Sequence, residues 1–204
     1  SIREMTRTRR SPGDVMDAAA RAVEAAGWTQ PWGADADHLK TPEDITACAA
    51  AGFTMFTLDP GEHVNRDADS AAPGALREAW DALPWERLED SPASMRARLA
   101  GRVFDAEGQS VQIDEGTLVK AAVKYGRAVA HVTAMYRHLC AVKGDRPFDL
   151  EVSVDETDTP TAPAEHLFVA SELRRLGVQW ASLAPRFVGR FEKGVDYIGD
   201  LGAF

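Results

Sequence analysis

Hydrophobic and polar positions in this chain follow two periods, one typical of helices and one typical of strands. Apolar residues at helical spacing predict helices over residues 12–26, 42–51, 115–142 and 161–176, which end close to Gly27, Gly52, Gly144 and Gly177. Short apolar or alternating runs between them predict strands over residues 31–38, 53–59, 148–156 and 178–183. This alternation of strands and helices is typical of an α/β fold whose sheet is parallel and covered on both faces.

Residues 64–114 interrupt the alternation with acidic and proline-rich turns. We expect two short helical pieces around 73–82 and 84–100, then a small hairpin whose strands are 102–104 and 111–113, joined across residues 105–110. The segment is interpreted as an insertion over the strand ends, acting as a lid, or equally as a packed peripheral subdomain. Residues 191–204 are expected to form a loop that enters a helix without completing it.

A helix followed by strands that alternate with helices is the order of elements found in a (β/α) barrel. A closed barrel has eight strands and typically about 250 residues, so 204 residues with an insertion supply about half of one. We therefore expect residues 1–204 to be part of a single TIM-type barrel domain that carries the insertion 64–114. The remaining half would lie in further sequence or in another copy of the chain. An open, doubly wound sheet is the alternative.

Composition and charge exclude some classes of protein. The chain has 32 acidic residues against 23 Lys and Arg, a net charge of -9, which argues against a nucleic-acid binder. No apolar run approaches the roughly 18 residues of a membrane span, so no membrane partner is expected. Cys48 and Cys140 fall in expected helices and form no CxxC motif, which favours a reduced, cytoplasmic protein. We expect the basic cluster Arg3, Arg7, Arg9 and Arg10 to be solvated.

The first strand exit concentrates polar chemistry. Asp35, Asp37 and His38 are followed at once by Thr41 as a helix N-cap and Pro42 at the first helical position. Catalytic groups collect where parallel strands end, because these ends open into one crevice. In strand alternation Asp37 and His38 point to opposite faces, so both reach the site only if the strand ends or twists here. The second strand also ends in polar groups, Asp59, Glu62 and His63.

The third strand carries its polar residues on one face. Leu150, Val152 and Val154 share one side, and the other side holds Asp149, Glu151, Ser153 and Asp155. An antiparallel edge strand facing water shows the same pattern, but the flanking helices favour a parallel strand whose polar face lines an active-site cavity. Arg186 follows the fourth strand, where its guanidinium would bind a carboxylate in bidentate fashion.

Three histidines outside these strands are expected to be structural. His131 and His138 lie seven residues apart on one face of the long helix, whereas a zinc pair on a helix is more often at i and i+4 with a third group nearby. His166 is expected to be a packed or surface residue.

Five stretches resemble the tagaturonate epimerases, also called tagaturonate/fructuronate epimerases, whose relatives act on tagatose and fructose. They are Ser1–Glu4, Gly33–Lys40, Phe53–His63, Glu151–Thr157 and Phe191–Leu201. The resemblance runs nearly end to end, and family members are much longer than 204 residues. It implies a barrel fold, a divalent metal cation as cofactor, and a hexuronate or ketose as substrate.

By motif, the resemblance makes Asp37 the acid/base that takes a proton, Glu151 the complementary proton donor and His38 a metal ligand. Two further histidine ligands are expected from segments that follow residue 204 in family members. The candidate substrate-binding residues are Glu4, Asp155 and Arg186.

The implied reaction inverts the fourth carbon of the sugar chain, which is β to the ketone on the second carbon, so simple enolisation does not reach it. The fourth carbon would be inverted by retro-aldol cleavage between the third and fourth carbons, rotation of the aldehyde and re-addition. The cation would stabilise the enediolate as a Lewis acid, and two carboxyl groups would carry the hydroxyl proton. Their pKa values must differ, and we hypothesise that His38, through the cation, keeps Asp37 ionised while Glu151 stays protonated.

Two alternatives remain at this point. One is a class II aldolase-like or sugar isomerase barrel that uses the same metal and carboxylates. The other is a non-catalytic, truncated fragment that binds a sugar acid or serves only a structural purpose. A homo-oligomer would be a second way to complete the barrel.

Overall fold

The computed structural model describes residues 1–106, 108–155, 157–192 and 194–204. Its helices are α1 (Ile2–Thr8), α2 (Pro12–Ala25), α3 (Pro42–Ala51), α4 (Pro73–Asp81), α5 (Pro92–Leu99), α6 (Glu115–Lys143) and α7 (Pro163–Arg175), with 3-10 turns η1 (Gly61–His63) and η2 (Arg66–Asp69). Its strands are β1 (Asp35–Leu39), β2 (Met55–Leu58), β3 (Arg102–Ala106), β4 (Gln109–Ile113), β5 (Asp149–Val154) and β6 (Ser182–Pro185). The α/β class is confirmed.

The helix starts expected from the sequence are confirmed by their capping contacts. The Thr41 hydroxyl accepts a hydrogen bond from the backbone N–H of Asp44 at 3.2 Å, and the Asp44 carboxylate accepts one from the N–H of Thr41 at 3.1 Å. Ser11 and Asp14 form the same reciprocal pair at the start of α2. Each pair satisfies two backbone donors that a helix start leaves free. These caps fix where β1 gives way to α3.

Several boundaries differ from the expectation. Helix α1 was not predicted, and only Met5 within it is buried, so it carries little of the apolar periodicity that reveals a helix. The helix expected over 84–100 is present only as α5, which begins at Pro92 after the N-cap Ser91. The strand expected over 178–183 is displaced to β6, because the N–H of Val178 closes helix α7 by donating to Leu173 O at 3.0 Å.

Two further expectations concern the ends of segments. Within the described part of residues 191–204, no helix begins, and the segment is held by a bridge between Arg190 and Ile198. The third strand was expected to reach Glu156, a residue that lies outside the described ranges, and β5 ends at Val154. The linker of the small hairpin likewise includes residue 107, which is not described.

The four-stranded sheet has the order β1-β2-β5-β6, and every neighbouring pair is parallel. The order of the strands in space therefore follows their order in the chain. Strand β5 lies between β2 and β6, so the alternative of an antiparallel edge strand is wrong. In a doubly wound sheet the order of the strands reverses at one point. The order of these four strands has no such reversal.

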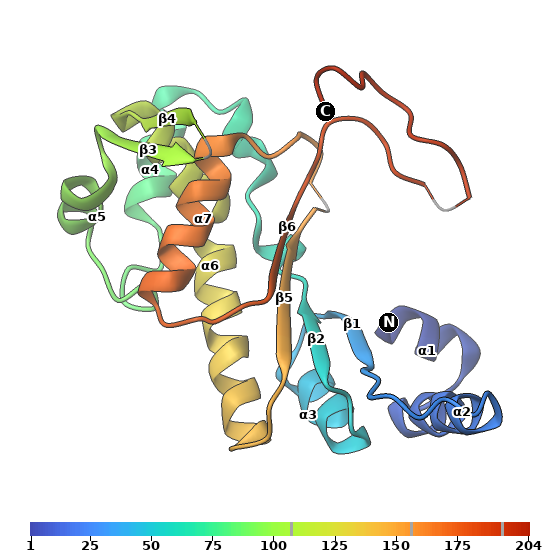
Figure 1. The fold of residues 1–204 in the computed structure, drawn as a ribbon. Helices are drawn as coiled ribbons and strands as arrows, with labels where there is room; N and C mark the ends of the chain where they lie inside the picture. Colours follow the sequence, from blue (N-terminus) through green and yellow to red (C-terminus); the bar gives the residue numbers. More distant parts are fainter. Residues whose placement is uncertain (107, 156, 193) are drawn as a thin grey trace.

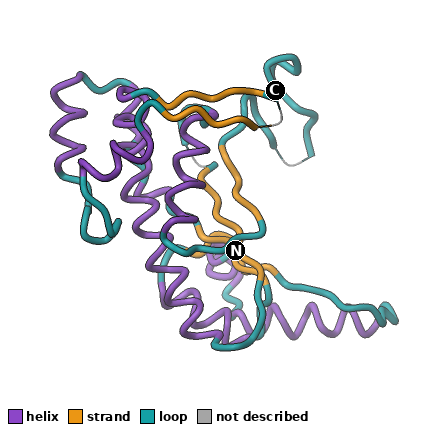
Figure 2. Tube along the Cα trace, turned by 60° about the vertical axis from the view of Figure 1, so that its left-hand side comes forward, coloured by secondary structure: helices purple, strands orange, loops and turns teal. Residues whose placement is uncertain are grey.

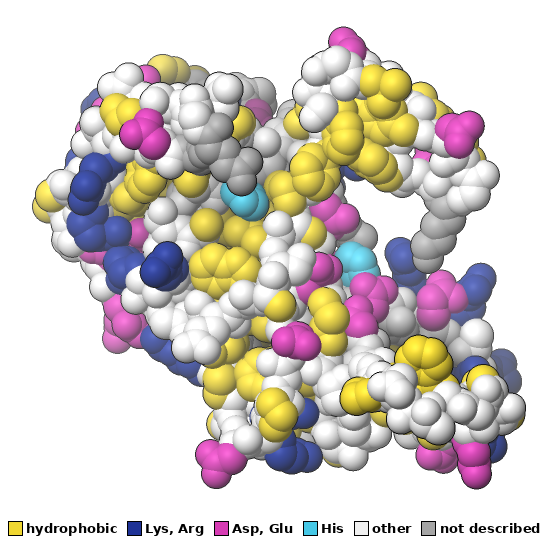
Figure 3. All heavy atoms as spheres, in the orientation of Figure 1, with side chains coloured by type: hydrophobic (Ala, Val, Ile, Leu, Met, Phe, Trp, Pro, Cys, Tyr) yellow, Lys and Arg dark blue, Asp and Glu magenta, His cyan; other side chains and the backbone are white. Residues whose placement is uncertain are grey.

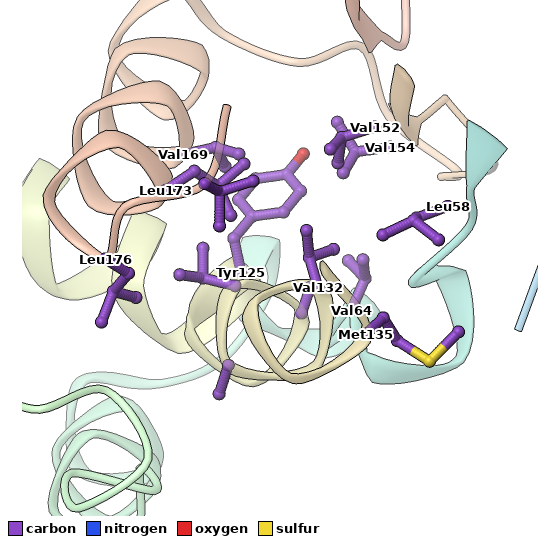
Figure 4. Packing of buried hydrophobic residues seen from close by; sticks show 14 of the residues in the cluster. Leu58, Val64, Tyr125, Val132, Met135, Val152, Val154, Val169, Leu173 and Leu176 are labelled. Atoms are coloured by element: carbon purple, nitrogen blue, oxygen red, sulfur yellow. The ribbon is translucent and has the colours of Figure 1, made fainter. Parts of the chain in front are cut away.

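One face of the sheet is covered by a layer of helices. Helix α6 packs against both α3 and α7, and Figures 1 and 2 show the strands on one side of this layer. In Figure 4, Val152 and Val154 of β5 point toward Tyr125 of α6 and toward Val169 of α7. These side chains are buried, with exposed fractions between 0% and 3%. The apolar face of the sheet and this helix layer form the core.

The insertion packs against α6 and α7 around buried apolar side chains that include Trp80, Leu88, Met95 and Ile113. It is also held by charge, because Arg98 of α5 contacts Glu172 of α7 at 2.8 Å and also pairs with Asp90. The exposed fraction of the Glu172 side chain is 0%. In Figure 1 the hairpin β3–β4 and helices α4 and α5 lie beside α6 and α7, away from α1. These contacts describe a firmly packed unit on the helix layer.

None of the helices in the described ranges combines the length and the apolar character needed to cross a lipid bilayer.

Candidate functional site

The face of the sheet opposite the helix layer is polar and partly exposed. Asp35 on β1 is exposed, Glu151 on β5 is half-buried, and between these two strands lies Thr57 of β2, which is 1% exposed. The Thr57 hydroxyl contacts both carboxylate oxygens of Asp35, at 3.2 and 3.3 Å. Thr57 is also the register partner of Glu151. This open face therefore carries the residues that the sequence placed on the polar side of the strands.

A β-bulge brings Asp37 and His38 to the same place. Ala36 pairs with Phe56 and Leu39 with Leu58, so two residues of β1 stand opposite the single residue Thr57. His38 has a φ of 56°, in the left-handed region, which is uncommon for residues other than glycine. The strand does not end at His38, as one form of our expectation held, but it is irregular there. As a result, His38 Nε2 lies 3.6 Å from Asp37 Oδ1.

The other nitrogen of the His38 ring contacts a buried carboxylate. His38 Nδ1 lies 3.2 Å from Oδ2 of Asp59, whose side chain is 2% exposed. Asp59 Oδ1 accepts a hydrogen bond from the backbone N–H of Gly61 at 2.9 Å, and Lys40 Nζ lies 3.4 Å from Asp59 Oδ2. Burial opposes the charge of Lys40, but Asp59 and Glu62 outweigh it and raise the pKa of the ammonium group. His38 is thus held between Asp37 and Asp59.

Three carboxylates on the open face influence one another. Partial burial raises the pKa of Asp35 above its ordinary value, and repulsion from Asp37 and Glu151 adds to this shift, while the hydrogen bond from Thr57 opposes it. Asp35 therefore senses both residues that the family resemblance makes the acid and the base. An environment that separates the protonation of neighbouring carboxyl groups is what general acid/base chemistry requires.

On β5 the polar residues lie as the alternation predicted. Leu150, Val152 and Val154 are buried, whereas Glu151 and Asp155 are half-buried. The Ser153 hydroxyl donates to Asp155 Oδ1 at 2.5 Å, which orients that carboxylate. Asp155 directly follows β5, two pleat repeats beyond Glu151 and toward the carboxyl end of the strand.

Arg186 follows β6 directly, and its backbone is anchored by Thr161. The N–H of Arg186 donates to Thr161 Oγ1 at 3.0 Å, and Arg186 O accepts from the N–H of Thr161 at 2.8 Å. Its side-chain Nε atom is buried and has no hydrogen-bond partner among the described residues. A buried donor without an acceptor is uncommon in folded proteins and suits a guanidinium that binds a ligand.

Glu4 lies on α1, at the other side of β1. Its carboxylate contacts Arg7 at 2.6 Å, and Glu4 lines a hollow that also contains Asp35 and Asp37. A second hollow, on the other flank of α1, is lined by His38, Lys40 and Asp59. Figure 3 shows acidic side chains gathered around a histidine in the depression between the C-terminal segment and α1. Helix α1 thus forms one wall of the site.

The donors for a metal ion are incomplete in the described ranges. Nowhere in those ranges do three or more His, Cys, Asp or Glu side chains form a group that would hold a metal. What is present fits one part of such a site: an imidazole whose Nδ1 contacts a carboxylate, and whose Nε2 faces a second carboxylate. In protein metal sites, a ligating histidine almost always has its other nitrogen held in this way.

Two of the three histidines expected to be structural have protein partners, and the third, His166, has a buried Nδ1 without a hydrogen-bond partner among the described residues. His131 of α6 stacks on His63 of η1, with 3.9 Å between ring centroids. His138 Nε2 lies 2.8 Å from the hydroxyl of Thr46 in α3. Neither of these two histidines of α6 lies among the residues of the open face.

Sequence reasoning gave no role to two residues that organise the site. Asp59 was noted only as a polar residue at a strand exit, and Thr57 only as part of an apolar strand. The signal for Thr57 was its place between apolar residues in a strand expected to be covered on both faces, where a hydroxyl needs a partner. No such pattern marks Asp59 as the partner of His38, because that contact depends on the bulge in β1.

Comparisons with known proteins agree on one family. The family model described as tagaturonate epimerase matches residues 1–204. A tagaturonate/fructuronate epimerase from Thermotoga maritima is 44% identical over 205 residues, which cover 100% of this chain and 40% of that protein.

Solved structures give the same result. A glycerol-complexed crystal structure of the fructuronate-tagaturonate epimerase UxaE from Cohnella laeviribosi has a TM-score of 0.89 and 39% identity, over 99% of this chain and 40% of its own. The native crystal structure of the same enzyme has a TM-score of 0.88 and 39% identity, over 98% of this chain and 40% of its own. The chain therefore spans about 40% of the length of these relatives.

Proposed function

The chain belongs to the tagaturonate epimerase family, and on that basis we propose that it is part of an enzyme that interconverts D-tagaturonate and D-fructuronate. The neutral ketoses tagatose and fructose are the secondary substrates of this proposal. The observation that carries it is the shared open face, on which Asp37 and His38 of β1 and Glu151 of β5 lie on either side of Thr57.

The spacing of the strands suits an acid and a base that act on one substrate from two sides. Strands β1 and β5 are separated by β2, so their backbones lie on the order of 10 Å apart at about 4.8 Å per strand. A sugar carbon and its hydroxyl fit between carboxyl groups that extend from these strands. In this proposal Asp37 removes the proton of the hydroxyl at the inverted carbon, and Glu151 returns a proton from the other side.

We further propose that the Nε2 atom of His38 binds a divalent cation, whose remaining protein ligands lie outside the described residues. When bound, the cation supplies Lewis-acid polarisation of the substrate oxygens. Retro-aldol cleavage and re-addition at the inverted carbon would then require only that Asp37 and Glu151 move the hydroxyl proton. Arg186 would bind the uronate carboxylate, and Glu4 and Asp155 would bind its hydroxyl groups.

We propose that this chain is part of a (β/α) barrel, which further sequence in the complete protein closes. The strands lie side by side in chain order, the helices form a layer on one face, and the polar residues lie on the other face. In a closed barrel the face without helices lines the interior, and active sites lie at the carboxyl ends of the strands. His38, at the bulge near the end of β1, and Arg186, directly after β6, lie near those ends, which supports the proposal.

The experiment that tests the proposed function is substitution in the complete protein. Asp37→Asn and Glu151→Gln are each expected to lower turnover of D-tagaturonate more than tenfold, about 1.4 kcal/mol of barrier. Asp149→Asn is the matched control, because it removes a carboxylate from the same face of β5 at an exposed position. Turnover within tenfold of wild type for either variant would show that its residue has a different role.

Product analysis by NMR separates the proposed reaction from its rival. An epimerase converts one six-carbon acid into another, whereas an aldolase releases two three-carbon products. If the protein binds the sugar acid and the NMR spectrum still shows only the starting sugar acid, the chain belongs to a binding fragment.

A further inference from the structure

The buried carboxylate of Asp59 and the exposed carboxylate of Asp37 contact opposite nitrogens of the His38 ring. We propose that Asp59 is a positioning residue: it determines which nitrogen of His38 carries the proton and so presents Nε2 as the free donor atom. The inference deepens the proposed function and rests on it only where His38 is taken as a metal ligand.

For the neutral imidazole, the geometry favours one tautomer. His38 Nδ1 lies 3.2 Å from Asp59 Oδ2. An ionised carboxylate only accepts hydrogen bonds, so the proton of a neutral imidazole must be on Nδ1 to make this contact. The lone pair is then on Nε2, which lies 3.6 Å from Asp37 Oδ1, and the His38 residue lines the hollow beside α1. This tautomer leaves a ligand atom directed toward the candidate acid/base.

Asp59 is held firmly enough to impose this choice. Its side chain is 2% exposed, and the N–H of Gly61 donates to its Oδ1 at 2.9 Å, while Oδ2 is the oxygen that contacts His38. Lys40 Nζ lies 3.4 Å from that Oδ2 and favours its negative charge. The two contacts leave Asp59 no rotation that would keep Gly61 satisfied while it releases His38.

The left-handed backbone of His38 completes the arrangement. The bulge in β1 turns the His38 side chain out of the regular alternation and toward the exit of β2, where Asp59 follows Leu58. A non-glycine residue at positive φ is strained, and the contacts of the ring help to offset that strain. Of the two carboxylates that the His38 ring contacts, Asp59 is the buried one.

Asp59→Asn is the decisive variant, because the amide has the same size and shape as the carboxylate. The N–H of Gly61 still requires an acceptor, so the amide oxygen takes the place of Oδ1 and the NH₂ group faces His38. Nδ1 must then accept a hydrogen bond, which moves the proton to Nε2 and blocks that atom as a ligand. A role in packing alone would survive this change.

The first measurement is the tautomer of His38 in the complete, metal-free protein, by ¹⁵N NMR of labelled histidine at slightly alkaline pH. The wild type is expected to carry the proton on Nδ1, and Asp59→Asn on Nε2. The second measurement is the affinity for Zn²⁺ by competition with a chromophoric chelator. Asp59→Asn is expected to weaken it by about 10- to 100-fold, the usual loss for an outer-shell partner of a ligating histidine.

Glu62→Gln is the matched control. Glu62 also contacts Lys40 at 3.4 Å, but its side chain is 76% exposed and makes no hydrogen bond or ion pair with His38 among the described residues. It is expected to leave the tautomer and the Zn²⁺ affinity within about twofold of wild type. An unchanged Nδ1–H tautomer in Asp59→Asn, with the fold intact by circular dichroism, would overturn the inference.

His38→Ala separates this inference from the proposed function. If His38→Ala leaves Zn²⁺ affinity unchanged, His38 is not a ligand and the proposed function loses its metal site, while the NMR result still decides the role of Asp59. If His38→Ala abolishes binding but Asp59→Asn has no effect on either measurement, the ligand assignment stands and the positioning role is wrong.

Discussion

The imidazole rings of His63 and His131 stack with 3.9 Å between their centroids, which joins the turn η1 to helix α6 behind the candidate site. Burial lowers the pKa of both rings from the ordinary value of 6.5. Arg87 and Arg127 add to the shift of His63, and His63 itself adds to that of His131. Glu62, and for His131 a backbone contact with Lys40, oppose these shifts only in part.

The first prediction is that stability falls as the pH drops below about 6.5. Because the folded pKa values lie below the unfolded one, the unfolded chain takes up these protons first, so the free energy of unfolding decreases with falling pH in that window. Urea unfolding at pH 7.5 and 5.5 measures the difference. His131→Phe keeps an aromatic ring but cannot titrate, so its pH dependence is expected to be smaller than that of the wild type.

The half-buried His166, whose pKa is also lowered by burial, is present in both proteins and cancels in this comparison. Carboxylates that titrate near pH 5.5 cancel in the same way. An equal loss of stability in His131→Phe and in the wild type would show that the stacked pair does not contribute.

The second prediction concerns Thr57, which donates to both oxygens of Asp35 at 3.2 and 3.3 Å. This hydrogen bond favours the ionised carboxylate and holds the pKa of Asp35 below the value that burial and the neighbouring acids would give it. Thr57→Val keeps the shape and removes the donor, so the pKa of Asp35 is expected to rise further. Carboxyl ¹³C NMR of labelled aspartate, followed as a pH titration, measures the change.

Thr54→Val serves as the control for that titration. Thr54 Oγ1 accepts from the N–H of Ala34 at 3.0 Å, near the same edge of the sheet, and has no hydrogen bond to Asp35. It is expected to leave the Asp35 titration unchanged. A pKa of Asp35 that stays the same or falls in Thr57→Val would mean that the hydroxyl does not stabilise the charge.

The third prediction tests how the insertion is attached. Glu172 of α7 is fully buried and pairs with Arg98 of α5 and with Arg175, each at 2.8 Å. Glu172→Gln removes a buried anion that Arg98 and Arg175 share, although Arg98 keeps Asp90, and is expected to cost about 3 kcal/mol of unfolding free energy. Glu115→Gln removes an exposed partner of Arg96 and is expected to cost less than about 1 kcal/mol. Urea unfolding of the two variants compares them directly, and similar costs would contradict a buried attachment.

The parallel strands and the capped helices were predictable because local signals decide them. The pair Thr41 and Asp44 marks a helix start wherever it occurs, and the alternation from Leu150 to Val154 marks a face. Helix α1 was not predictable because only Met5 within it is buried, and the position of β6 was not predictable because the end of α7 competes with the strand for a backbone donor. The Val178 N–H, for example, is used to close α7 and is therefore lost to the strand.

The residues of the site were predictable by type and position, but their contacts were not. Asp37, His38 and Glu151 were placed on the correct strands by pattern and by family resemblance. The pairing of His38 with Asp59 required a bulge and a left-handed residue, and neither the β-period nor the residue types of β1 indicate either one.

The last prediction concerns the recognition of the uronate. A bidentate contact between a guanidinium and a carboxylate is worth about 1.5–3 kcal/mol, and the buried, unpaired Nε of Arg186 is one of the donors that would make it. Arg186→Ala in the complete protein is therefore expected to lower kcat/KM for D-tagaturonate by about 10- to 100-fold, mainly through KM.

Turnover of tagatose is the internal reference for this variant, because a neutral ketose has no carboxylate for Arg186 to bind, and its kcat/KM is expected to change by less than about threefold. Arg190→Ala removes an exposed arginine from the same segment and is expected to affect neither substrate. A loss that is equal for the acid and the neutral ketose would mean that Arg186 supports the strand exit through Thr161 instead of binding the substrate. A loss confined to the acid would assign the carboxylate end of the substrate to β6, and so orient the sugar chain across the open face toward Glu151 and Asp37.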